Sequence, residues 1–290
     1  SGRVSTPMPP HSSLLLFQPT PFQLLSTSFG SGGGKMDSSE SIDDDDASHS
    51  TCATISSDED EDEDDTEFVE YHKEDDTTFT AIEQNDPNLQ NLNLMRCSPT
   101  ALPSNEWIAL GRNIGNNTCM KKLIVCTDRL FEDEDQTKEN LEAFCSGLSH
   151  NRSLRFLMFN SFDFHRARLE LLRPFVVENL NLTDLQLRSC DMSVQDIQML
   201  SNTFRQRRNP SSIKSIALTG PNINDESVRA IVELSNNCPH LKKLDLGSSR
   251  IGDQGCNELV VLLQNPESKL KRLHLNVNFI GNEGALVLSN

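Results

Sequence analysis

The sequence predicts an α/β solenoid, a stack of strand–helix units, preceded by a disordered N-terminal region. Three observations predict this arrangement. A motif of the form L-x-x-L-x-L recurs seven times from residue 89 onward. In the second half of the repeats, after this motif, apolar residues have the spacing of a helix. Acidic residues are concentrated before the first copy, so the chain of 290 residues divides into an unpatterned and a patterned part.

The N-terminal region contains two segments of different composition. Residues 1–36 are rich in Ser, Pro and Gly and are expected to be disordered. Because Met36 opens a plausible natural start, residues 1–35 are interpreted either as an ordinary flexible terminus or as an extension introduced by the gene model. Residues 37–76 hold 19 Asp/Glu against one base, Lys73, a net charge of −18. They are interpreted as a solvated, disordered acidic tract, with a docking arm for a basic partner as the alternative.

Residues 77–290 are predicted to form one domain of about seven repeats, the last of them incomplete. The copies are 28 to 34 residues apart and begin at Leu89, Met120, Leu154, Leu182, Ile213, Leu241 and Leu270. Each copy supplies one short strand, a turn and one helix, and a single copy cannot bury its own apolar residues. Stacked copies bury these residues in one continuous core, which explains why the pattern repeats.

The helix of each copy is predicted from apolar residues three and four positions apart. In residues 193–204 this spacing includes Ile197 and Leu200, and in a later copy it runs through Leu259 and Leu263. Asp, Asn and Ser residues before these runs are expected to cap the helices. The chain ends inside the seventh helix without a polar closing repeat, although solenoids need capped ends for solubility. We therefore expect a fragment, with a self-associating end as the alternative.

Two segments that open helices carry a resemblance to a known family. Residues 251–255 read I-G-D-Q-G and residues 280–284 read I-G-N-E-G, within repeats of 28 to 29 residues. The sequence therefore resembles the ribonuclease-inhibitor class of leucine-rich repeat proteins. The resemblance implies a horseshoe with parallel strands on the concave face, helices on the convex face, and recognition of protein partners. The class includes inhibitors, the sensor arms of NOD-like receptors and Ran GTPase-activating proteins.

The predicted protein-binding site consists of residues that flank the L-x-L leucines, because strand side chains alternate between the two faces of a sheet. Its members are Ile124, Phe156, Met158, Asn160, Gln186, Arg188, Lys243, Asp245, Arg272 and His274. Ile124, Phe156 and Met158 are expected to form an exposed apolar cluster that anchors the partner. The alternatives are a shifted register in these irregular copies, or a cover formed by the flanking residues 66–79.

Charge on the same face allows two interpretations. Lys122, Arg188, Lys243 and Arg272 add scattered positive charge, which either steers an acidic partner or contacts the chain's own acidic tract. His274 stands alone and is interpreted as a polar surface residue rather than a ligand or a base.

Several functional classes are excluded by composition and motifs. Outside residues 37–76 the net charge is +1, which provides no general attraction to nucleic acid. No apolar stretch is suited to spanning a membrane, and no metal, nucleotide-loop or catalytic spacing appears. No cofactor and no small-molecule substrate are therefore expected. The eight cysteines form no CxxC pair and are interpreted as small buried residues of a reducing compartment.

The sequence thus predicts a non-enzymatic scaffold that binds an unidentified protein through the concave face of the solenoid. It is expected in the cytoplasm, with the nucleus as the alternative location. A GTPase-activating protein of the Ran type is the alternative function, since that class joins such repeats to an acidic region, although typically after the repeats. A NOD-like sensor arm would need a nucleotide-binding domain, which this sequence does not show.

Overall fold

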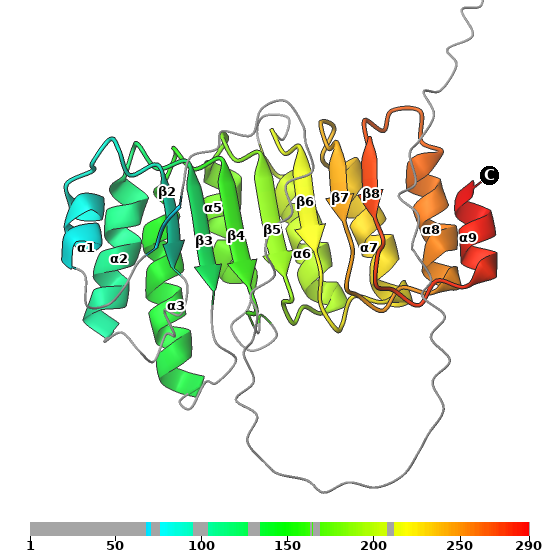
Figure 1. Ribbon diagram of the computed structural model, residues 1–290, viewed down its shortest axis with the longest axis horizontal. Helices are drawn as coiled ribbons and strands as arrows, with labels where there is room; N and C mark the ends of the chain where they lie inside the picture. The colour runs from blue at the N-terminus through cyan, green and yellow to red at the C-terminus, as the bar shows by residue number, and fades with distance from the viewer. Residues whose placement is uncertain are drawn as a thin grey trace, which may run out of the picture.

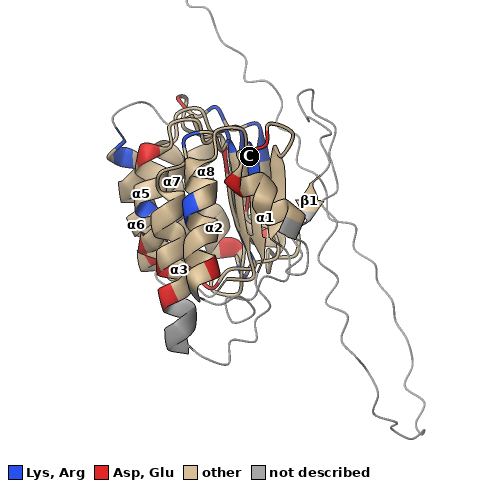
Figure 2. Cartoon of the chain, turned by 90° about the vertical axis from the view of Figure 1, so that its left-hand side faces the viewer, with Lys and Arg blue, Asp and Glu red and all other residues tan. Residues whose placement is uncertain are grey.

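The computed structural model describes residues 68–70, 76–94, 104–126, 134–162, 164, 169–207 and 212–289. These residues form two layers, a curved sheet and a layer of helices that covers one face of it (Figure 1). Figure 2 looks along the stack from its N-terminal end and shows the helices on one side of the sheet. The predicted solenoid with strands inside and helices outside is therefore confirmed. Residues 1–36 and most of the acidic tract lie outside the described residues.

The sheet contains eight parallel strands that follow one another in chain order. They are β1 (Val69–Glu70), β2 (Asn91–Leu94), β3 (Lys122–Cys126), β4 (Phe156–Asn160), β5 (Asp184–Arg188), β6 (Ser215–Leu218), β7 (Lys243–Asp245) and β8 (Arg272–His274). Each strand from β2 to β8 begins two residues after the predicted start of a repeat. The seven predicted copies therefore correspond one to one with seven strands.

The helices run antiparallel to the strands on the convex side. They are α1 (Asp76–Glu83), α2 (Ser104–Asn116), α3 (Glu134–Leu148), the 3-10 helix η1 (Leu169–Leu172), α5 (Arg173–Glu178), α6 (Val194–Arg205), α7 (Asp225–Asn236), α8 (Asp253–Leu263) and α9 (Asn282–Ser289). Ser193 caps α6 and Asn224 caps α7, each in a reciprocal capping box with the residue three positions later.

Strand β1 corrects the predicted organisation of the N-terminal region. It lies inside the segment predicted to be disordered, and α1 already begins at Asp76, so the predicted domain boundary at residue 77 is too late. Val69 pairs with Leu92 and Glu70 with Asn93. Two residues are too few to show an alternating pattern in the sequence. The strand is defined by its pairing with β2.

One continuous core lies between the two layers. The leucine positions of strands β2 to β7, such as Leu157 and Phe159, are fully buried. In α6, Ile197 and Leu200 are exposed by no more than 2%. Burial of each such side chain contributes about 1.5–3 kcal/mol to the free energy of unfolding. In α8 the predicted stripe residues Cys256 and Leu259 are buried, and Leu263 is partly buried against the core. Leu262, which the spacing did not predict, is buried as well.

The turn after each strand from β4 to β8 contains a residue in the left-handed region. These residues are Ser161, Ser189, Gly220, Ser248 and Val277, with φ of 62°, 50°, 153°, 51° and 55°. Each lies five residues after the start of its strand. The left-handed conformation is costly for non-glycine residues, so its recurrence indicates that the turn geometry is imposed by stacking of the repeats.

An asparagine organises three of the turns that lead from a helix into the next strand. Asn151 Oδ1 accepts hydrogen bonds from the backbone N–H groups of residues 153 and 154, at 2.9 and 2.8 Å. Asn117 and Asn179 make the same pair of contacts in their own turns. The Nδ2 group of Asn151 donates to the carbonyl oxygen of Asn117 at 3.0 Å, which ties consecutive repeats together. These asparagines were not predicted from the sequence, although each stands three residues before a repeat start.

In the last three repeats, an aspartate at the start of one helix binds the start of the next helix. Asp225 Oδ1 accepts from the backbone N–H groups of Gly252 and Gly255, at 2.6 and 3.0 Å. Asp253 Oδ1 accepts in the same way from residues 281 and 284 of the next repeat, at 2.7 and 2.9 Å. A negative charge at a helix N-terminus is favourable because the N–H groups there lack partners within the helix. The I-G-D-x-G segment therefore fastens one repeat to the next.

Helices α2 and α3 touch through their backbones. A Cβ atom placed on Gly111 would lie 2.7 Å from the Cα atom of Phe144, and one placed on Gly147 would lie 2.5 Å from the backbone nitrogen of Arg112. Beside this contact, the rings of Trp107 and Phe144 meet edge to face with their centroids 5.4 Å apart. Only glycine allows helices to approach this closely.

Candidate protein-binding face

The strand register arranges the predicted site residues in three rows that cross the concave face. The upper row contains Lys122, Phe156, Asp184, Ser215, Lys243 and Arg272. The middle row contains Asn93, Ile124, Met158, Gln186, Ala217, Asp245 and His274. The lower row contains Cys126, Asn160 and Arg188. All ten predicted residues therefore lie on the face opposite the helices, as alternation requires.

The expected exposed apolar cluster is wrong in two of its three members. Ile124 is 5% exposed and Met158 is 4% exposed, and only Phe156 is partly exposed. Ile124 and Met158 are direct partners on β3 and β4. Side chains on paired strands stand about 5 Å apart and cover one another, so apolar residues in the middle row are shielded by their neighbours. These two residues are poor candidates for direct contact with a partner.

A polar network occupies the centre of the face. Arg188 on β5 forms an ion pair of 3.0 Å with Asp245 on β7. The pair spans the intervening strand β6, whose middle-row residue is the small Ala217. Arg188 Nε also donates to Gln186 Oε1 at 2.7 Å, and Asp245 Oδ1 accepts from the backbone N–H of Gly247 at 3.0 Å. The network fixes these side chains in one geometry and neutralises most of the local charge.

The remaining predicted residues surround this network. Asn160, Lys243, Arg272 and His274 are all partly exposed, and His274 pairs in register with Asp245. The structure therefore brings together a polar centre with a basic upper margin, instead of an apolar anchor.

Asp184 is the acidic residue of the upper row, and its environment disfavours the charged form. Burial raises the pKa of its carboxyl group above the ordinary value, while hydrogen bonds from Thr183 and Ser215 and the charges of Lys214 and Lys243 act in the opposite direction. Thr183 Oγ1 donates to Asp184 Oδ2 at 2.6 Å. A carboxylate in this position costs stability at neutral pH.

We expect Asp184→Asn to raise the free energy of unfolding at pH 7 by up to about 1 kcal/mol. The raised pKa means that the folded wild type binds the proton more tightly than the unfolded chain, so it loses stability as pH rises through the folded-state pKa. Below the unfolded-state pKa of about 3.9 both forms are neutral, and the advantage of the variant disappears. Urea titrations of both proteins between pH 3 and pH 7 measure this difference; an advantage that persisted unchanged to pH 3 would contradict it.

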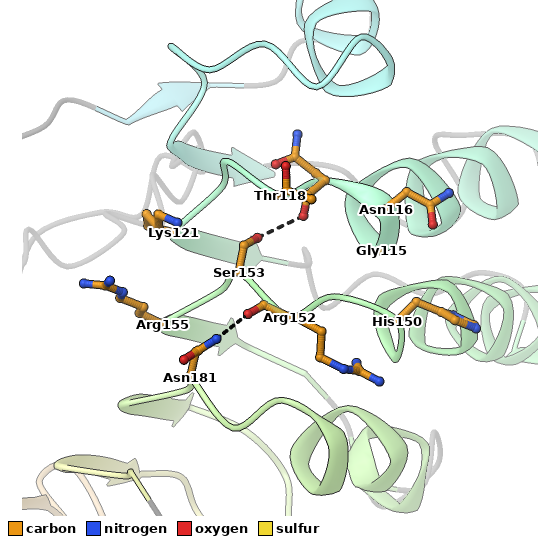
Figure 3. A pocket seen from close by; sticks show the side chains of 10 residues that line it. Gly115, Asn116, Thr118, Lys121, His150, Arg152, Ser153, Arg155 and Asn181 are labelled. Atoms are coloured by element: carbon orange, nitrogen blue, oxygen red, sulfur yellow. Dashed lines mark hydrogen bonds between the residues drawn. The ribbon is translucent and has the colours of Figure 1, made fainter.

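A pocket of about 480 Å³, which sequence reasoning missed, lies among the helix-to-strand turns beside β3, β4 and β5 (Figure 3). It is lined by Gly115, Asn116, Asn117, Thr118, Lys121, His150, Arg152, Ser153, Arg155 and Asn181. Figure 3 shows Lys121 and Arg155 extending from one side, and Arg152 and His150 from the side of the helices. The available signal was the basic residue that follows the first apolar residue in five of the seven copies.

Within the described ranges, no group of three or more His, Cys, Asp or Glu side chains is arranged to hold a metal ion. Burial raises the pKa of the Cys145 thiol to about 12 and that of Cys256 to about 11, so neither provides a reactive thiolate at neutral pH. None of the helices in the described part of the chain is long and apolar enough to cross a membrane.

Comparison with known sequences agrees with the repeat architecture. Residues 237–260 match the model of a family described as Leucine Rich repeat. A relative named Ribonuclease inhibitor, from Mus musculus, is 23% identical over 184 residues, an alignment that covers 53% of this chain and 40% of the relative. The chain thus spans less than half the length of this relative.

Comparison with solved structures finds chains of low sequence identity and low TM-score. The actin-binding site 2 region of leiomodin-1 is 12% identical and has a TM-score of 0.38, covering 56% of this chain and 85% of that one. An internalin from Listeria monocytogenes is 16% identical with a TM-score of 0.34, covering 70% and 53%. The repeats and the parallel sheet give the described part of this chain the fold of a leucine-rich repeat solenoid. Its repeats are similar to those of ribonuclease inhibitor.

Proposed function

We propose that the chain is a non-enzymatic scaffold that binds a protein partner through the concave face of its solenoid. The observation that carries this proposal is the polar network of Arg188, Asp245 and Gln186, held rigidly on a sheet face that no described helix covers. Preorganised side chains bind with little loss of conformational entropy. The partly exposed Phe156 and Asn160 supply additional contact surface beside the network.

A cytoplasmic or nuclear location is part of this proposal. The six cysteines in the described part of the chain are not joined in disulfides, and four of them are buried. Free thiols accord with a reducing compartment, where disulfides are rare.

The test is affinity capture from a native lysate with the full chain as bait. The site variant is Phe156→Ala/Asn160→Ala/Gln186→Ala, which truncates partly exposed residues and leaves Ile124 and Met158 intact. The matched control is Glu142→Ala/Arg229→Ala/Glu258→Ala, three exposed residues on the helical face. We expect a set of proteins that the wild type and the control retain and the site variant loses. Equal capture by all three baits would show that the concave face is not the binding surface.

The same material tests the alternative function. If a GTPase is captured, single-turnover hydrolysis of its bound GTP is measured with catalytic amounts of the chain. An acceleration would contradict the non-enzymatic assignment, whereas tight binding without acceleration agrees with a scaffold.

A further inference from the structure

Basic residues recur at one fixed position where each strand begins. The backbone N–H of this residue donates to the carbonyl oxygen of the residue at the same position in the preceding repeat. The series begins with the carbonyl oxygen of Gln90, and its N···O distances are 2.6 to 2.8 Å. The residues joined in this way after Gln90 are Lys121, Arg155, Thr183, Lys214, Lys242 and Lys271. We call them the strand-start row. The hydrogen-bond ladder shows that they form one continuous line along the edge of the sheet.

The cations of this row are available to a ligand. Arg155, Lys214, Lys242 and Lys271 are exposed, and Lys121 is partly exposed. Among the residues that the structure describes, none of these five side chains forms an ion pair, in contrast to Arg188 and Arg152. The helices end at the same edge, and their C-termini favour nearby positive charge without neutralising it.

The upper row of the concave face follows the strand-start row one residue later and adds to its charge. The two rows together comprise twelve positions from residue 121 to residue 272, of which eight are basic and one, Asp184, is acidic. Figure 2 shows Lys and Arg gathered at the end of the sheet where the helix-to-strand turns lie. The strip is therefore predominantly basic, in a chain whose net charge is −17.

The pocket of Figure 3 forms the N-terminal end of this strip. Lys121 and Arg155 belong to the row and also line the pocket, where Arg152 and His150 join them. Glu178 contacts Arg152 at 3.5 Å, with both side chains at least half exposed. Ser153 Oγ and Asn181 Nδ2 donate to backbone carbonyl groups, which fixes the walls of the pocket.

The dimensions of the strip suit an extended polypeptide. Five steps of about 4.8 Å separate the strands from β3 to β8, a length of about 24 Å, which an extended chain of about seven to eight residues covers. The strand-start row contains no aromatic side chain on which bases would stack. Carboxylates on a flexible segment pair readily with exposed lysines.

We propose that the strand-start row, with the pocket at its N-terminal end, binds an acidic segment of a partner polypeptide. This inference rests on the proposed function, because it names the chemistry of the partner, but it assigns the contact to the edge of the sheet rather than to its centre.

The test is fluorescence anisotropy of a labelled glutamate-rich peptide of about ten residues, titrated with the full chain. Every variant keeps residues 37–76 unchanged, so that any competition from this acidic tract is the same in all of the proteins compared. We expect Lys214→Gln/Lys242→Gln/Lys271→Gln to raise the Kd about fivefold or more at low salt, since exposed pairs each contribute up to about 1 kcal/mol. The effect should shrink as salt screens the charges.

Two further variants make the result specific. Arg112→Gln/Arg205→Gln/Arg229→Gln removes the same charge from the helices and should change the Kd by less than about twofold, because these residues lie outside the row. Asp184→Asn removes the acid from the strip and should tighten binding by about two- to threefold. Circular dichroism establishes that each variant is folded.

Three outcomes would overturn the proposal. In the first, the wild type does not bind the peptide. In the second, the helix variant loses as much affinity for the peptide as the row variant does. In the third, a single-stranded oligonucleotide of equal charge binds more tightly than the peptide and is lost in the row variant. The Phe156→Ala/Asn160→Ala/Gln186→Ala variant should bind the peptide as the wild type does. Failure of the edge contact is therefore distinguishable from failure of the concave-face scaffold.

Discussion

Gly147→Ala is expected to lower the free energy of unfolding by about 3 kcal/mol, because the added methyl group has no space between α2 and α3. Its nearest neighbours would be the backbone of Gly111 and the backbone nitrogen of Arg112. No flexible side chain can move aside, so the two helices must separate. Separation would also loosen the edge-to-face contact of Trp107 with Phe144. Alanine has the higher helix propensity, but that gain is only about 1 kcal/mol.

Urea-induced unfolding followed by circular dichroism measures this loss. Ser146→Ala is the matched control, since Ser146 is the preceding residue of α3 and is exposed. It should leave the free energy of unfolding within about 0.5 kcal/mol of the wild-type value. If Gly147→Ala proved as stable as Ser146→Ala, the close approach of the two helix backbones would be refuted.

Asp225→Ala is expected to destabilise the fold by about 2–3 kcal/mol, because two partly buried backbone N–H groups lose a charged acceptor. These groups belong to Gly252 and Gly255 at the start of α8. Asp225→Asn keeps a neutral acceptor oxygen and should lose only about 1 kcal/mol. Comparison of the two variants separates the contribution of the hydrogen bonds to the free energy of unfolding from the contribution of the negative charge.

Thermal and urea unfolding of the same variants measure this effect. Glu226→Ala is the control, since Glu226 is also acidic and in the first turn of α7 but is exposed. Its interaction with the helix dipole contributes no more than about 1 kcal/mol. Equal losses in Asp225→Ala and Glu226→Ala would mean that the helix dipole accounts for the effect and that the link between the repeats contributes nothing.

The repeat pattern was sufficient to place the strands, because each copy contains its own apolar spacing. Strand β1 was missed since it exists only through pairing with Leu92 and Asn93, which lie more than 20 residues away. The sequence therefore predicts the parts of the fold that are encoded locally within one repeat. Contacts between repeats depend on which residues the register brings together.

The candidate site shows the same division. Alternation along the strands predicted that all ten residues share the face opposite the helices, as the register has it, but it carried no information on their exposure. Ile124 and Met158 are buried because each stands beside the other on neighbouring strands. The ion pair of Arg188 and Asp245 needs the small Ala217 between them, a condition that no single repeat reveals. The basic residues of the strand-start row recur in the sequence, but it is the hydrogen bonds between the strands that show them to be aligned.

The ladder of strand-start hydrogen bonds has a mechanical consequence. The carbonyl oxygen of Lys121 accepts from both Arg155 and Phe156, and equivalent pairs join each later strand to the one before it. These bonds point along the stack, so tension applied to its two ends loads them in series and not in parallel. Apart from the ion pair of Arg188 and Asp245, which spans β6, the repeats are joined mainly to their neighbours. Rupture of one junction therefore leaves most of the others intact. Under tension the molecule should therefore lengthen in steps at low force, as single repeats detach one after another.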